Sequence, residues 1–159
     1  MKRLKKFFGY TLTELLIVIA IIGIISGIVF VSSPNLRRFK ELTLTTQEIM
    51  SVIRDTQNRS MTQESGQRWG IRFQNSTSTN HSYTVFKGLS YASGTVVATY
   101  YLKPYIQFSD PSTGLAKEVV FLPISGLPQA STTIKINLVP NSNVSTTIVI
   151  NENGKIQNY

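Results

Sequence analysis

A long apolar run near the N-terminus limits what this chain can fold into more than any other feature. Residues 15–31 carry no charge and are rich in Ile, Leu and Val. As a helix they would be about 25 Å long, near the length that crosses a bilayer. Basic residues are concentrated before the run, so the N-terminus is expected to stay cytoplasmic while the rest is exported. The sequence therefore predicts a transmembrane helix over residues 10–33.

The acidic residue Glu14 stands at the front of this run. A carboxylate in hydrocarbon costs about 2.5–3.5 kcal/mol, so its presence needs a reason. A cleavable secretory signal fits poorly, because Val31, Ser32 and Ser33 are followed by Pro34 rather than by a small-residue cleavage site. A simple one-pass anchor explains the length of the run but leaves Glu14 unexplained.

Helical periodicity continues beyond the apolar run. The apolar and threonine positions recur three or four residues apart, with charged residues mostly between them. These positions are Phe39, Leu42, Thr46, Ile49, Ile53 and Thr56. One helix is therefore predicted from Tyr10 to Met61, with an amphipathic half at 34–63. Pro34 should bend it, since proline removes a helix hydrogen bond.

From residue 64 to 159 the pattern changes to short strands separated by turns. Alternating or β-branched segments occur at 69–73, 82–86, 95–102, 118–124, 132–139, 145–150 and 154–157. Asn153-Gly154 predicts a hairpin with a type I′ turn. The expected head is a small antiparallel β-sheet whose apolar face is covered by the amphipathic helix half. The predicted fold class is therefore α+β.

The N-terminal residues carry a specific resemblance. A basic stretch, Lys2–Lys6, is followed by Gly9, the aromatic Tyr10 and then Glu14 four residues later. The apolar string Leu15–Ile24 continues the pattern. This segment resembles the N-terminus of type IV prepilins and type II secretion pseudopilins. The resemblance implies a type IV pilin-like fold, with a long N-terminal helix packed on a β-rich head.

The resemblance also implies a processing pathway. Residues 1–9 would be a leader peptide, and a prepilin peptidase that also acts as an N-methyltransferase would cut between Gly9 and Tyr10 and methylate Tyr10. The chain would lie in the inner (cytoplasmic) membrane and then join a pilus or pseudopilus. There Glu14 is expected to pair with the N-terminal amine of a neighbouring subunit, because a buried carboxylate is tolerated when paired. Tyr10 stands where phenylalanine is usual, and Thr13 where an aliphatic residue is common.

The head favours one branch of the family. The chain has no cysteine for the disulfide loop of many major pilins. Its acidic residues after position 100 are too sparse for the calcium loop of major pseudopilins. It resembles H-type minor pseudopilins and FimT-like minor pilins at Phe121–Gly126, at Ile148–Ile150 and at Gly154–Ile156. A structural minor subunit is the expected function.

The sequence gives little indication of an enzyme. His81 is the only histidine and is expected to be a solvated loop residue. No paired carboxylates, phosphate-binding loop or nucleophile motif is visible, so no catalytic residue, metal or cofactor is assigned. Trp69 opens a strand and is expected in the core.

Two alternatives stay open from the sequence. The chain has 16 Lys and Arg against 8 Asp and Glu, a net charge of +8. A DNA-uptake or adhesive tip subunit would contact DNA or a surface through a basic cluster. Its candidate residues are Arg54, Arg59, Arg68 and Arg72. The other alternative is a single-pass anchored β-domain that never assembles, which would have no need of Gly9 or Glu14.

Overall fold

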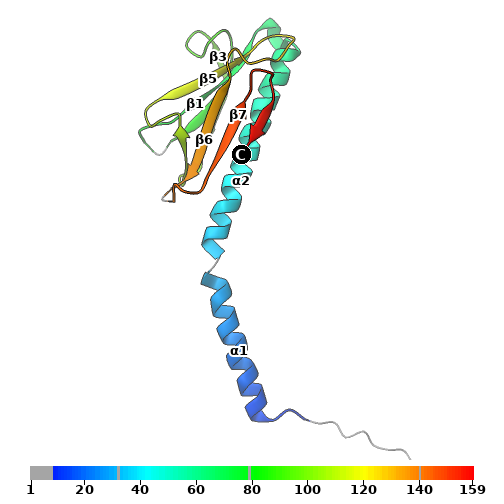
Figure 1. Ribbon diagram of the computed structural model, residues 1–159, viewed down its shortest axis with the longest axis vertical. Helices are drawn as coiled ribbons and strands as arrows, with labels where there is room; N and C mark the ends of the chain where they lie inside the picture. The colour runs from blue at the N-terminus through cyan, green and yellow to red at the C-terminus, as the bar shows by residue number, and fades with distance from the viewer. Residues whose placement is uncertain (1–8, 32, 79, 140) are drawn as a thin grey trace, which may run out of the picture. The chain divides into compact units, whose positions relative to one another are not determined.

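The computed structural model describes residues 9–31, 33–78, 80–139 and 141–159, without the side chains at 27–35. It divides into two units, Met1–Arg37 and Arg38–Tyr159, and each is described by itself (Figure 1). The predicted leader at 1–9 lies outside the described residues except for Gly9.

The helical part consists of α1 (Leu12–Val31) and α2 (Ser33–Met61), followed by a 3-10 turn, η1 (Glu64–Gly66). The helix begins two residues later than predicted, because Tyr10 and Thr11 have no helical conformation. Pro34 is the second residue of α2, where its missing N–H has no helical acceptor to lose. Residue 32 lies outside the described residues, so the bend at Pro34 stays a prediction.

The described residues of the head form two four-stranded antiparallel sheets. Sheet I has the strand order β3-β2-β1-β5, and sheet II the order β4-β6-β7-β8. The strands are β1 (Trp69–Gln74), β2 (Ser82–Lys87), β3 (Thr95–Tyr101), β4 (Ile106–Asp110), β5 (Ala116–Phe121), β6 (Thr132–Leu138), β7 (Ser145–Ile150) and β8 (Ile156–Asn158). The α+β class and the antiparallel pairing are confirmed, but the prediction of one sheet is wrong.

The head has a second sheet because strands that are consecutive in sequence do not all pair with one another. After β3 the chain starts a new sheet with β4, which pairs with β6, whereas β5 returns to pair with β1. No strand was predicted at β4, a short segment between Pro104 and Pro111 that reads as loop. Its buried residues Ile106 and Phe108 nevertheless alternate with polar ones.

One hydrophobic core joins α2 to both sheets. Leu42, Ile49 and Ile53 of α2 lie in the same buried cluster as Ile71 of sheet I and Ile136 of sheet II. Five of the six positions predicted for the inner helix face are buried, whereas Phe39 is exposed. Trp69 is buried, as predicted.

Two polar side chains fasten sheet I to sheet II. The Asn75 amide, which follows β1, donates to the carbonyls of Phe108 and Pro111, each at 2.7 Å. The Lys117 ammonium on β5 lies 2.5 Å from the Asp110 carboxylate and donates to the Thr133 carbonyl at 3.0 Å. Both contacts cross between sheets, so they fix the two sheets in one head.

The end of α2 is held by two loops that are distant in sequence. Gln57 Nε2 donates to the Gly126 carbonyl at 2.8 Å and to the Gly154 carbonyl at 3.0 Å. Ser60 Oγ, which is buried, donates to the Phe121 carbonyl at 2.7 Å. These contacts join the helix to Phe121–Gly126 and to the β7–β8 turn, the two head segments that the sequence analysis singled out.

Replacing Gln57 by Ala is expected to lower the free energy of unfolding by about 1–3 kcal/mol, because two carbonyls lose their donor. Urea unfolding of the full chain in detergent, followed by Trp69 fluorescence, measures the change. The matched control is Gln47→Ala, at an exposed position of the same helix, which should shift the midpoint little. Equal shifts for both variants would contradict the structural role of Gln57.

The β7–β8 hairpin is present, but its turn differs from the prediction. Gly154 has φ 78°, and its N–H donates to the Asn151 carbonyl at 2.9 Å. A type I′ turn needs positive φ at both central residues, and Asn153 does not have it. The loop is one of the longer hairpin types, with glycine in the left-handed position. The type I′ prediction is therefore wrong.

Candidate processing and assembly segment

The residues just before α1 form a helix cap. Gly9, Tyr10 and Thr11 precede the helix, and the Glu14 N–H donates to Thr11 Oγ1 at 3.3 Å. The Leu15 N–H donates to the Thr11 carbonyl at 3.2 Å, which is the first bond of the helical pattern. Thr11 is thus the N-cap, and the bond between Gly9 and Tyr10 lies outside the helix. Sequence reasoning missed this role, although Thr-x-x-Glu before an apolar run is a capping-box pattern.

Tyr10 and Glu14 lie close together at the start of α1. With Leu15 and Val18 they line an open pocket of about 270 Å³. Glu14 is in the first helical turn, where the partial positive charge of the helix N-terminus favours a carboxylate. Both predicted residues are exposed. An aromatic ring and a negative charge are therefore presented together beside the predicted cleavage site.

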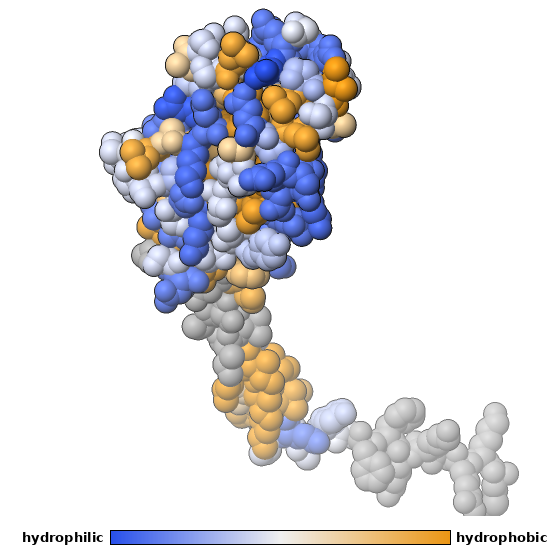
Figure 2. Space-filling view, turned by 45° about the horizontal axis from the view of Figure 1, so that its top comes forward, coloured by the Kyte–Doolittle hydropathy of each residue, from blue (hydrophilic) through white to orange (hydrophobic). Residues whose placement is uncertain are grey.

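From residue 15 to residue 25, α1 is apolar and exposed on every side. Residues 12–26 are all exposed, and Figure 2 shows this part of the helix almost entirely in hydrophobic colours. A helix that is apolar all round is normally buried in a membrane or among other helices. Within the described residues, no helix meets the combined length and hydropathy of a candidate membrane span. Part of the predicted span, the side chains at 27–33, lies outside that description.

Comparison with protein families gives one match, which covers this segment. Residues 4–30 match the model of the prokaryotic N-terminal methylation motif. The chain carries this methylation motif. The match includes Gly9, Tyr10 and Glu14 but covers less than a fifth of the sequence. No curated protein and no solved structure matches the chain.

The methylation motif supports the type IV pilin and pseudopilin family in general. It indicates a structural subunit that a prepilin peptidase processes, that is anchored in the inner membrane before assembly, and that assembles with other pilins. It does not distinguish a pilus from a pseudopilus or one branch of minor subunits from another.

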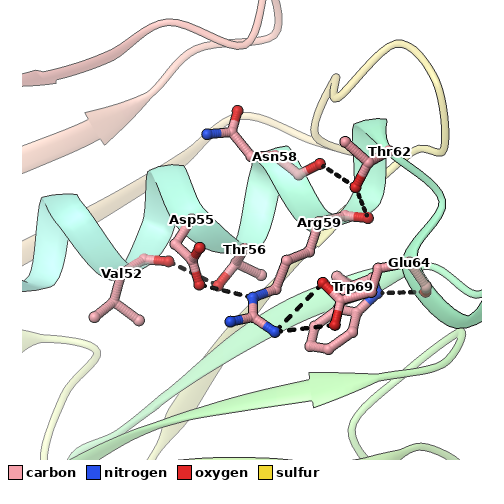
Figure 3. Close-up of polar contacts among 8 residues, drawn as sticks. All are labelled: Val52, Asp55, Thr56, Asn58, Arg59, Thr62, Glu64 and Trp69. Carbon is pink, nitrogen blue, oxygen red and sulfur yellow. Dashed lines mark hydrogen bonds and ion pairs between the residues drawn. The ribbon is translucent and has the colours of Figure 1, made fainter.

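The predicted DNA-contact residue Arg59 is occupied by contacts within the head. Its Nε lies 2.8 Å from Asp55, its Nη1 lies 3.1 Å from Glu64, and its guanidinium carbon lies 5.1 Å from the centre of the Trp69 ring (Figure 3). The Asp55 hydrogen bond is the main cause of a raised Arg59 pKa. Because two carboxylates neutralise the guanidinium, it is a poor phosphate contact.

The other three arginines do not join Arg59 in one basic stripe. Arg72 lies on β1 three residues after Trp69, and neighbouring positions of a strand face opposite sides, so Arg72 projects from the other face. There its guanidinium lies 4.2 Å from the Tyr91 ring centre. Arg54 is exposed on α2, and Arg68 is half-buried before β1. The structure therefore places Arg59 and Arg72 on opposite sides of β1, so the four candidate residues do not form one continuous stripe.

His81 is buried, which corrects the prediction of a solvated loop residue. Only 7% of its surface is exposed, and its carbonyl accepts from the Leu102 N–H at 2.8 Å. Its Nδ1 is buried without a hydrogen-bond partner among the described residues. Burial lowers the pKa of His81 from its usual value of 6.5. The loop preceding β2 packs inward here, which its polar composition did not reveal.

Stability is expected to fall as the pH drops below about 6.5. The unfolded chain then protonates His81, whereas the folded chain, with its lowered His81 pKa, does so only at lower pH. The slope should stay below about 1.4 kcal/mol per pH unit, the limit for one proton. Urea midpoints at pH 5.0–7.5 test this. The variant His81→Gln should make the urea midpoint depend less on pH. An unchanged pH dependence in this variant would contradict the role of His81.

Proposed function

We propose that this chain is a structural minor subunit of a type IV pilus or a type II secretion pseudopilus. The observation that carries the proposal is the methylation motif over residues 4–30, which includes a helical segment, residues 15–25, that is apolar and exposed. The exposed apolar surface of such a helix is unfavourable in water, so the helix is expected to be covered by lipid or by other protein. A bilayer covers it before assembly, and neighbouring helices cover it in a filament.

In this proposal, cleavage between Gly9 and Tyr10 releases a new amine at the start of α1. Three features support that position. Gly9 and Tyr10 are exposed and non-helical, so the bond is open to a peptidase. No atom of the described residues other than its chain neighbours lies within 4 Å of where a Gly9 side chain would be. Thr11 is the N-cap of α1, so the helix begins after the Gly9–Tyr10 peptide bond and does not include it. Methylation of the Tyr10 amine follows cleavage.

Glu14 supplies the pairing charge for assembly. Its carboxylate lies beside Tyr10 in an open pocket with mostly apolar lining. When helices of neighbouring subunits pack over this pocket they exclude water, so an amine that enters it finds a counter-charge in an environment of low dielectric. A pairing of this kind selects one register between neighbouring helices, because any other register leaves the carboxylate unpaired.

The head is proposed to be of the minor H-type or FimT-like kind. The supporting observation is that Phe121–Gly126 and the Gly154 turn, the short segments behind that assignment, both dock on α2. Gln57 bonds Gly126 and Gly154, and Ser60 bonds Phe121. Both segments thus act as parts of one helix-docking structure.

Mass spectrometry of the N-terminal peptide tests the processing. The chain is expressed in cells that contain a prepilin peptidase, and membranes are digested and analysed. The expected peptide begins at methylated Tyr10. A peptide that retains Met1 or Lys2 would make the chain only an anchored protein, and a start after Val31 would make it a secreted domain.

A further inference from the structure

Three of the four sheet edges in the head are protected against pairing with another chain. The β5 edge carries Lys117 and Glu118, and Phe121 at its end already bridges to Pro128. The β4 edge is short and ends at Asp110, which is followed by a proline. The β8 edge has only three residues. Charges, prolines and short strands are the usual devices that prevent edge pairing.

The fourth edge, β3, has none of these three devices and only one other, a bulge near Val97. Its seven residues, Thr95–Tyr101, include no charge and no proline. Six of them are exposed, among them Val96 at 50%, Val97 at 46% and Tyr101 at 70%. A bulge interrupts the pairing with β2 near Val97, but Ala98–Tyr101 pair with β2 in regular register. Natural proteins seldom leave so open and apolar an edge without a partner.

The side chains of β3 are exposed on both faces of sheet I. Tyr100 stacks on Tyr83 on the face towards the core, with ring centres 5.0 Å apart, yet remains 37% exposed. On the other face Thr84 Oγ1 lies 3.2 Å from Thr99 Oγ1, and Tyr101 extends into solvent. A strand placed beside β3 would therefore find β-branched and aromatic cross-strand neighbours on either face, which stabilise sheets.

We propose that the β3 edge binds an extended strand of a different protein chain, which is uncharged where it pairs and has an acidic residue beyond each end. Backbone hydrogen bonds to the free edge of β3 would give affinity, as in other strand-addition complexes. The incoming strand becomes the fifth strand of sheet I, next to Ala98–Tyr101. The proposal concerns the head and does not depend on N-terminal processing.

Charge at the two ends of β3 identifies the partner's chemistry. Lys87 lies opposite Thr95 at one end of the strand. Lys103 follows the other end, and its ammonium lies 3.6 Å from Glu41 with half of its side chain exposed. A second copy of this chain would bring the same two lysines to the interface, where like charges would meet. Acidic ends on a different chain complement them instead.

Binding of synthetic peptides to the full chain in detergent tests the proposal. The probe is a fluorescein-labelled peptide of seven alternating Thr and Val residues with one Glu at each end, measured by fluorescence anisotropy. We expect binding that becomes about tenfold weaker when the two Glu are replaced by Lys. N-methylation of alternate amides should abolish binding, because it removes the donors that pair with β3.

Two variants of the chain locate the binding site. Val97→Lys places a charge on the edge and should abolish peptide binding. Leu89→Lys makes the same change at an exposed apolar residue of the preceding loop and should leave binding unchanged. Trp69 fluorescence confirms that both variants fold. Hydrogen exchange should show that the peptide protects amides within Ala98–Tyr101.

Several results would overturn the proposal. Absence of binding by the Glu-ended peptide would exclude strand addition at this edge. Equal binding of the N-methylated peptide, or equal loss in Leu89→Lys, would show contact elsewhere. If the full chain alone formed dimers that Val97→Lys dissociates, the edge would serve a second copy and the proposed partner would be wrong.

Discussion

Glu14→Gln is expected to leave cleavage after Gly9 intact while lowering the equilibrium constant for adding the subunit to a filament by about a hundredfold to a few thousandfold. Removing one partner of a buried ion pair costs about 3–5 kcal/mol, because the other charge stays buried without compensation. The Gln side chain keeps the size of Glu and its position beside Tyr10 but cannot carry the charge. The N-terminal cap is unaffected, since it uses the Glu14 backbone N–H.

The experiment separates processing from assembly within one set of cells. Mass spectrometry of membranes reports the fraction cut at Tyr10, and sheared filaments report the fraction assembled. The matched control is Glu64→Gln, which removes an exposed carboxylate of the head and should change neither fraction. Normal assembly of Glu14→Gln would refute pairing with the N-terminal amine, and loss of cleavage would place Glu14 in peptidase recognition.

Gly70→Ala is expected to destabilise the head by about 1–3 kcal/mol, the range for inserting a group into a close-packed site. A Cβ at Gly70 would lie 2.5 Å from Phe86 Cζ and 2.8 Å from the Val119 carbonyl oxygen. Neither neighbour moves easily. Phe86 is fully buried against Tyr91, and the Val119 carbonyl belongs to β5, the neighbouring strand.

Urea unfolding followed by Trp69 fluorescence measures this loss. Gly23→Ala is the matched control, because nothing lies within 4 Å of that position and α1 does not belong to the head. Adding Phe86→Leu to Gly70→Ala should recover part of the loss, since it removes the nearest clash, and a double-mutant cycle measures that coupling. A stable Gly70→Ala protein would contradict the close approach at this position.

Local sequence patterns predicted most of the secondary structure. Seven of the eight strands fall on segments recognised from β-branched residues and turns, since these preferences act within a few residues. The amphipathic face of α2 was predicted because helical spacing is also local. The missed strand, β4, has flanking prolines that resemble loop chemistry, and its pairing with β6 comes from residues about thirty positions away.

The candidate sites divide in the same way. Gly9, Tyr10 and Glu14 could be predicted from the sequence because the methylation motif, which residues 4–30 match, is a contiguous pattern at fixed spacing. The four candidate arginines could be identified in the sequence, but their positions relative to one another could not be predicted from it. Arg59 is neutralised by Asp55 and Glu64, and it lies on the opposite side of β1 from Arg72, which no linear pattern shows.

The sequence by itself determined the N-terminal segment and the α+β class, because an apolar run, a motif and an alternating pattern are properties of neighbouring residues. Only the tertiary structure decided that the head has two sheets, that His81 is buried, and that Gln57 binds carbonyls 69 and 97 positions away. It alone also decided that β3 is the unprotected edge. These features depend on which distant segments meet, and that is set by the packing of one shared core.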